Sequence, residues 1–316
     1  MRRSTQRCVL LLAAAVAATP PSRASAQDTG GPSYPARCGV GIPRDEQGGY
    51  VPLPRGDVFC PLLADPKAAQ SFVSYLREGS DAGTPDTSIQ IASVGLGDSF
   101  GLGRWGGSRP GDGSQLSLMG AIFAQFDLGT ASYDLLNSDY VIGLANTVRR
   151  GWFSTRLRLY HQSSHLGDEL LLREGGAALE RENLSFESLE LLLSADGGLL
   201  RLYGGGEYLF RRAPDDLERY VARGGAELRP AGRVLSLGGL GGFRFVAATD
   251  LKASQEQDWD PSVSARAGFE YDRAGPGDTQ ARRWRLLFEY YRGPSPYGQF
   301  FRENVEHIGV GLHFGL

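Results

Sequence analysis

The sequence of 316 residues has no apolar stretch long enough to cross a membrane as a helix. Its longest apolar run, residues 9–18, falls well short of the roughly 20 residues that such a helix needs. Arginines precede this run and the small residues 24–26 follow it, which is the order of a secretory signal peptide. We therefore expect export, with residues 1–26 removed as the signal peptide and Cys8 removed with them.

Cysteine is also scarce, because removal of the signal peptide leaves only Cys38 and Cys60. In an oxidising periplasm a lone pair of cysteines favours a disulfide, and the alternative is two free thiols. Closing a loop of this length would stabilise the segment by about 3 kcal/mol. We predict a disulfide between Cys38 and Cys60.

The chain has little net charge, −3, and no basic cluster, so nucleic acid is not an expected partner. A hydrophobic content of 41% and a mean hydropathy of −0.25 suit a soluble protein, but they suit a membrane barrel equally well. A barrel carries its membrane signal in alternation rather than in long runs. The 44 glycines lack the three-residue period of collagen.

Residues 27–70 are rich in proline and glycine and show no sustained period, so we expect an irregular periplasmic segment there. From residue 71 to residue 316 the pattern changes to alternation of period two. In the last segment Ile308, Val310 and Leu312 share one face, and glycine and histidine occupy the other. A helix would space its apolar positions three and four residues apart, so alternation indicates strands.

The pattern predicts an all-β fold, a closed antiparallel outer-membrane β-barrel of about twelve strands spanning residues 71–316. The expected strands are residues 71–78, 87–96, 115–126, 139–149, 152–164, 183–195, 199–211, 219–229, 234–249, 260–272, 282–292 and 304–316. The alternative is a soluble periplasmic β-sandwich or lipocalin-like barrel with its apolar face turned inward.

Charge decides which face meets lipid. Arginines stand opposite the apolar sets of many segments, at positions 156, 158, 201, 223, 244, 266 and 285, and glutamates share those faces at 190, 207, 227, 270 and 289. A charge on the lipid face costs roughly 2 to 4 kcal/mol at mid-bilayer, so these side chains should point inward. We expect them to pair across a largely filled lumen, with His307 and His313 joining their network.

Residues 160–169 hold two of the four histidines and interrupt the strand pattern. His161 and Ser163 continue the apolar, outward face of their strand, and Asn183 would lie opposite Ser163 if the two strands closed symmetrically around the loop between them. An imidazole can take the proton of a hydroxyl, and an amide can hold that imidazole in the required tautomer. The candidate catalytic group is therefore Ser163 as nucleophile, His161 as base and Asn183 as the residue that orients His161.

Acidic residues follow His161 and Ser163 in the adjoining loop. Asp168 and Glu169, with His165 nearby, could hold a hard cation such as calcium, which would stabilise an oxyanion. The alternative is structural: His161 would lie at the level of the lipid headgroups, and Ser163, His165 and Asp168 would order the loop by hydrogen bonds.

Several motifs of the chain resemble a bacterial family known only as a domain of unknown function, whose members are expected to be outer-membrane barrels. The matching stretches are residues 59–66, 161–169, 180–185, 250–252 and 311–315. Members of that family usually end in an aromatic residue, and Leu316 departs from this pattern.

A second resemblance is to outer-membrane phospholipase A and lipid A deacylase, whose barrels carry His-x-Ser on an outward face with serine as nucleophile. His161 and Ser163 match that motif, and Asn183 suits the third member of the phospholipase group. This implies a lipid acyl hydrolase acting on phospholipid or lipopolysaccharide at the extracellular rim of the outer membrane. A structural barrel, or a narrow transporter or passive channel, remains the alternative, since fold alone implies no function.

Overall fold

Almost all of the regular structure is β-strand. The computed structural model describes residues 48–80, 88–109, 111–172, 184–230, 232–238, 241–272 and 283–315. The strands are β1 (Tyr50–Pro52), β2 (Ser71–Ser80), β3 (Ile89–Gly106), β4 (Gly113–Asp127), β5 (Leu135–Arg150), β6 (Phe153–Leu166), β7 (Ser185–Gly197), β8 (Leu200–Ala213), β9 (Tyr220–Leu228), β10 (Leu235–Ser236), β11 (Gly242–Ser254), β12 (Pro261–Asp272), β13 (Arg283–Pro294) and β14 (Asn304–Gly315). The short helices are α2 (Asp168–Leu172), η4 (Gln255–Gln257) and η5 (Gly298–Phe300). None of these helices is long and apolar enough to cross a membrane.

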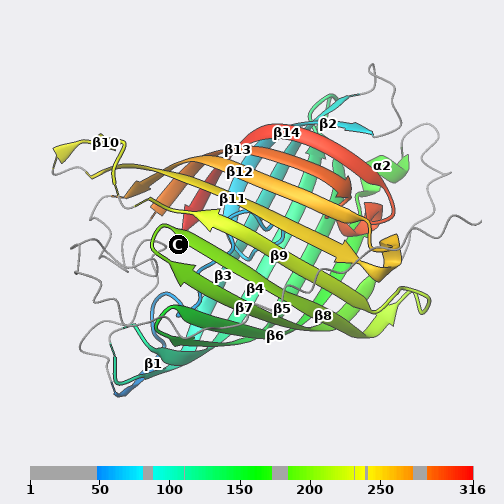
Figure 1. Ribbon diagram of the computed structural model, residues 1–316. Helices are drawn as coiled ribbons and strands as arrows, with labels where there is room; N and C mark the ends of the chain where they lie inside the picture. Colours follow the sequence, from blue (N-terminus) through cyan, green and yellow to red (C-terminus); the bar gives the residue numbers. More distant parts are fainter. Residues whose placement is uncertain are drawn as a thin grey trace, which may run out of the picture. The chain divides into compact units, whose positions relative to one another are not determined.

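Twelve of these strands form a closed antiparallel barrel. Successive strands pair along the chain, β2 pairs with β14, and β3 pairs with both β2 and β4, so the ring has no open edge. The short strands β1 and β10 pair with the ends of β3 and β11 at one end of the barrel, and α2 lies at the opposite end (Figure 1). A closed ring satisfies the backbone hydrogen bonds of every strand, which is the condition for crossing a bilayer with β-structure.

The wall of the barrel is apolar outside and polar inside. On β7, for example, Leu189, Leu191 and Leu193 are exposed, whereas Ser188 and Glu190 are buried. Other exposed apolar side chains on the outer wall include Leu157, Leu159, Leu202, Leu286, Phe288 and Ile308. This is the reverse of a soluble fold, so the alternative of a sandwich or lipocalin-like barrel with an inward apolar face is wrong.

All twelve expected strands exist, ten with ends within four residues of the prediction and two with larger differences. The strand expected at residues 87–96 continues to Gly106, because β4 pairs with it as far as Gly106 and β1 pairs with its end at Gly103–Trp105. The strand expected at residues 234–249 is divided into β10 and β11. Gly238 and Gly241, with φ of 61° and 103°, reverse the chain between them, and this left-handed backbone favours glycine.

The barrel interior holds part of the irregular N-terminal segment, residues 55–67, which we call the lumenal segment. Its backbone is bound by side chains of the inner wall: the Leu63 amide donates to Glu227 at 2.8 Å, Arg266 donates to the Leu63 carbonyl at 3.1 Å, and Arg149 donates to the Val58 carbonyl at 2.8 Å. Phe59 is buried and lies under two guanidinium groups of the wall. The lumen is therefore occupied by the protein's own chain.

Ion pairs fill much of the remaining lumen, as the inward arginines and glutamates predicted. Arg158 binds Glu190 through two hydrogen bonds of 2.8 and 2.6 Å. Glu270 accepts from Arg285 at 2.7 Å and also meets Arg229 and Arg283. The two histidines of the last strand join this network, His313 with Glu289 at 2.8 Å and His307 with Glu78 at 3.4 Å.

The lumenal segment also contains Cys60, which is completely buried, whereas its expected partner Cys38 lies outside the described residues. If the predicted disulfide forms, mature protein denatured without reductant should bind no alkylating reagent, and Cys38→Ser should bind one equivalent. Reduction should lower the free energy of unfolding by about 3 kcal/mol, because the unfolded chain regains loop entropy. Two reactive thiols in the unreduced wild type would contradict the prediction.

Candidate functional site

A group of polar side chains lies on the outer wall of the barrel, next to the exposed leucines of β6 and β7. It comprises His161 and Ser163 on β6, Ser185 and Glu187 on β7, and Tyr140 on β5, and we call it the outer-wall cluster. In the sheet register His161 lies between Ile142 and Glu187, and Ser163 lies between Tyr140 and Ser185. Below it on the same face are Leu157, Leu159, Leu189 and Leu191, all exposed. The cluster therefore lies at the boundary between an apolar belt and the rim that carries α2.

Glu187 holds the imidazole of His161. His161 Nδ1 lies 3.3 Å from Glu187 Oε1, and the two side chains are 40% and 28% exposed. Arg211 Nη1 lies 3.9 Å from the same oxygen. A proton on Nδ1 bound by this carboxylate leaves Nε2 as the nitrogen that can accept a proton from a hydroxyl.

The Ser163 hydroxyl shares this face with His161. The two residues are two apart on β6, so their side chains leave the wall in the same direction. Within the part of the chain that the structure describes, no hydrogen bond joins Ser163 Oγ to the His161 ring. Catalytic hydrogen bonds are often long or absent without substrate.

The expected pairing of Asn183 with Ser163 is wrong. Ser163 pairs with Ser185 and not, as symmetrical closure of the loop suggested, with Asn183, which lies outside the described residues. Among the described residues, the carboxylate that contacts the His161 ring is that of Glu187, which the sequence reasoning missed. The sequence could have identified Glu187, because it is an acidic residue on the same outward face as Leu189, Leu191 and Leu193.

The expected cation ligands lie at the end of β6 and the start of α2. Asp168 and Glu169 occupy the first turn of α2, and His165 packs edge-on against the Tyr140 ring at 5.6 Å. Calcium takes about six to eight oxygen ligands, so Asp168 and Glu169 would need further oxygens beside them to hold it. Among the described residues there is no group of three or more acidic, histidine or cysteine side chains that could hold a metal.

A second concentration of charge lies inside the barrel around Arg223 of β9. Its guanidinium binds Asp65 of the lumenal segment at 2.6 and 2.9 Å and lies 3.3 Å from Asp250 and 3.6 Å from Glu190. Burial alone would raise the pKa of Asp65, but Arg223 and Arg158 hold it below its usual value. Burial lowers the pKa of Lys67, which Asp139 opposes by pairing with it.

Solved structures support the fold. The outer-membrane phospholipase of Salmonella typhi, solved as a dimer with bound calcium, is 14% identical, with 79% of this chain and 94% of that chain covered and a TM-score of 0.50. An active-site asparagine mutant of outer-membrane phospholipase A from Escherichia coli is also 14% identical, with 78% and 90% covered and a TM-score of 0.50. At this identity the likeness shows an outer-membrane barrel fold and no more.

No curated protein matches the chain. One family profile does, over residues 47–316, which takes in the lumenal segment as well as every barrel strand. This is the family described as "Protein of unknown function (DUF1207)". The chain therefore belongs to this family.

Proposed function

We propose that this protein spans a bacterial outer membrane and hydrolyses acyl esters of lipids in the outer leaflet, with Ser163 as nucleophile, His161 as general base and Glu187 as the residue that orients His161. The observation that carries the proposal is the His161–Glu187 contact of 3.3 Å beside an outward serine. Carboxylate, imidazole and hydroxyl are the three groups of a serine hydrolase, which is defined by geometry rather than by order in the sequence.

The position of the outer-wall cluster at the edge of the apolar belt supports a lipid as substrate. Side chains at the edge of an apolar belt meet the ester region between acyl chains and headgroups. Arg211, whose side chain is 80% exposed, would meet the phosphate of a phospholipid at this level. The signal-peptide prediction agrees with this location, since an outer-membrane barrel must first be exported.

The chemistry follows from the three groups. Ser163 Oγ would attack the acyl carbonyl while His161 Nε2 takes its proton, and the ester C–O bond would break as His161 returns that proton to the departing alcohol. Water would then release the fatty acid from Ser163 by the same two proton transfers. Glu187 would stabilise the imidazolium at each step without itself changing its covalent bonds. No step is assigned to a cation.

The test is hydrolysis of a fluorogenic phospholipid by refolded protein in detergent, with calcium and with EDTA. Ser163→Ala and His161→Ala should each lower kcat by about 10³-fold or more, since the groups of such a site act as a unit. Glu187→Gln should lower kcat by about tenfold or more and change its pH profile, because the orienting charge on His161 is lost.

Matched controls come from the same wall. Ser185→Ala removes the hydroxyl directly across from Ser163, and His165→Ala removes the neighbouring histidine on the same strand face. Both variants should keep wild-type activity. Loss of activity in Ser185→Ala but not in Ser163→Ala would contradict the assignment of the nucleophile, and folded wild type with no lipid hydrolysis would contradict the function.

A passive channel was the alternative function that the sequence left open. The filled lumen does not support it. The lumenal segment contacts the inner wall at β5, β6, β9 and β12. Between these contacts lie the buried ion pairs of the wall. We therefore propose no transport function for the barrel in this state.

A further inference from the structure

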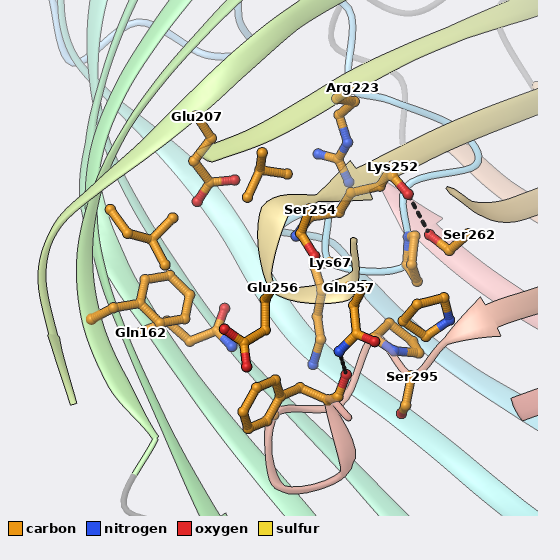
Figure 2. Close-up of a pocket in the computed structure, with 18 of the residues that line it drawn as sticks. Lys67, Gln162, Glu207, Arg223, Lys252, Ser254, Glu256, Gln257, Ser262 and Ser295 are labelled. Carbon is orange, nitrogen blue, oxygen red and sulfur yellow. Dashed lines mark hydrogen bonds between the residues drawn. The ribbon is translucent and has the colours of Figure 1, made fainter. Parts of the chain in front are cut away.

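A cavity of about 150 Å³ lies inside the barrel above the lumenal segment. Pro66 and Lys67 border it on the side of that segment, and Glu256, Gln257 and Phe301 border it on the side of the η4 and η5 loops. An engineered cavity of about this size holds a molecule of benzene. Its polar lining is shown in Figure 2, where Glu207 and Lys252 lie at the cavity with Arg223 between them. It is separate from the outer-wall cluster, whose side chains leave the other face of the sheet.

One wall of the cavity carries a carboxylate that has no cation. Glu207 Oε1 accepts hydrogen bonds from Tyr160 and from Ser188, the latter at 2.7 Å, and no basic side chain of the described residues lies within 4.0 Å of Glu207. The other glutamates that face the lumen from described strands each pair with an arginine or histidine: Glu78, Glu190, Glu227, Glu270 and Glu289. Glu207 is half-buried and lacks the cation that its neighbours have, and a charge partly removed from water is stabilised by a partner.

The opposite case lies two strands away in the sheet, on the other side of β9. Lys252 projects from β11 into the same cavity, and within the described residues its ammonium has no ion-pair or hydrogen-bond partner. It lies directly across from Arg223 in the register of β9 and β11, so two positive charges stand side by side there. The chain has only two lysines among its 33 basic residues, and both line this cavity. Lys67 is already satisfied by Asp139.

We propose that this cavity binds a small zwitterion, an α-amino acid of the size of alanine or serine, with its ammonium on Glu207 and its carboxylate on Lys252. An amine alone would leave Lys252 uncompensated, and a carboxylate alone would leave Glu207 uncompensated. A molecule that carries both charges a few bonds apart compensates both, and the cavity volume admits about six to ten heavy atoms. The site would therefore recognise the amino-acid backbone rather than a long side chain.

The scarcity of lysine makes the site directly observable. Reductive methylation with ¹³C-formaldehyde keeps the charge of each lysine and adds an NMR resonance to it, and Lys252→Arg identifies the Lys252 signal. Titration of the refolded, full-length protein with L-alanine should shift this signal saturably. Alaninamide and lactate have the same number of heavy atoms but one charge each, so each should bind at least about tenfold more weakly.

Variants separate binding from folding. Glu207→Gln keeps an oxygen for the Tyr160 and Ser188 hydroxyls but removes the charge, and it should weaken alanine binding by about tenfold or more. Glu306→Gln makes the same change on the exposed outer face of β14 and should bind as wild type does. The proposal is overturned if alanine gives no saturable shift, if Glu207→Gln binds as wild type, or if lactate or alaninamide binds as tightly as alanine. None of these outcomes bears on the hydrolase, whose groups lie outside the barrel.

Discussion

Deleting residues 28–66 should convert a non-conducting barrel into a conducting one. Wild-type protein reconstituted into planar bilayers should show no discrete conductance, because residues 55–67 occupy the lumen and bind its wall. Without this segment the inner wall keeps its charged side chains but loses the chain that fills the space between them. Water and ions would then enter a lumen whose walls already solvate charge. Single-channel recording measures the result.

The matched control is deletion of residues 28–47, which leaves the described lumenal segment complete and should keep the barrel closed. The segment should stay in place without its N-terminal extension, because Phe59, Leu62 and Leu63 are all buried. Each such side chain contributes roughly 1.5 to 3 kcal/mol of burial free energy. Equal conductance from wild type and from the longer deletion would contradict the assigned role of residues 55–67.

Arg223→Met should cause the largest loss of stability of any single arginine substitution in the lumen. It removes the guanidinium that meets Asp65, Asp250 and Glu190 together, and it leaves those carboxylates buried. Breaking a buried pair in this way costs about 3 to 5 kcal/mol, because the remaining charge keeps its desolvation penalty. Urea unfolding in detergent, followed by tryptophan fluorescence, measures the change.

The pH dependence of this loss has a definite sign. In the wild type the pKa of Asp65 is lowered, so its ion pair stabilises the fold above the unfolded pKa near 4 and is lost as the pH falls below it. In Arg223→Met burial dominates and raises the pKa of Asp65, so protonation relieves the penalty. The difference between variant and wild type should therefore be smaller at pH 4 than at pH 7. Arg77→Met, on the exposed face of β2, should change stability by less than about 0.5 kcal/mol at either pH.

The sequence by itself determined the strands and their two faces. Alternation of period two identifies a strand locally, and the cost of placing charge in lipid assigns the arginine and glutamate positions to the inner wall. Both arguments need only neighbours along the chain. For the same reason the outward placement of His161 and Ser163 was predictable, because it follows from the parity of Leu157 and Leu159 on one strand.

Strand register was decided only by the tertiary structure. A slip of two residues between β6 and β7 leaves every side chain on its own face, so parity cannot distinguish Asn183 from Ser185 as the neighbour of Ser163. The actual register depends on how the loop between the strands closes and on pairing with β8, where a bulge lies between Glu187 and Ser188. The contact between Glu187 and His161 follows from that register.

The position of residues 55–67 also required the folded barrel. This segment has no period, and several of its hydrogen bonds go to side chains more than 90 residues away in the sequence, such as Arg149, Glu227 and Arg266. The cavity with Glu207 and Lys252 has the same origin, since its walls come from strands that meet only when the sheet closes. Local alternation therefore fixes which face a residue occupies, whereas the partners it meets across the lumen depend on closure of the whole ring.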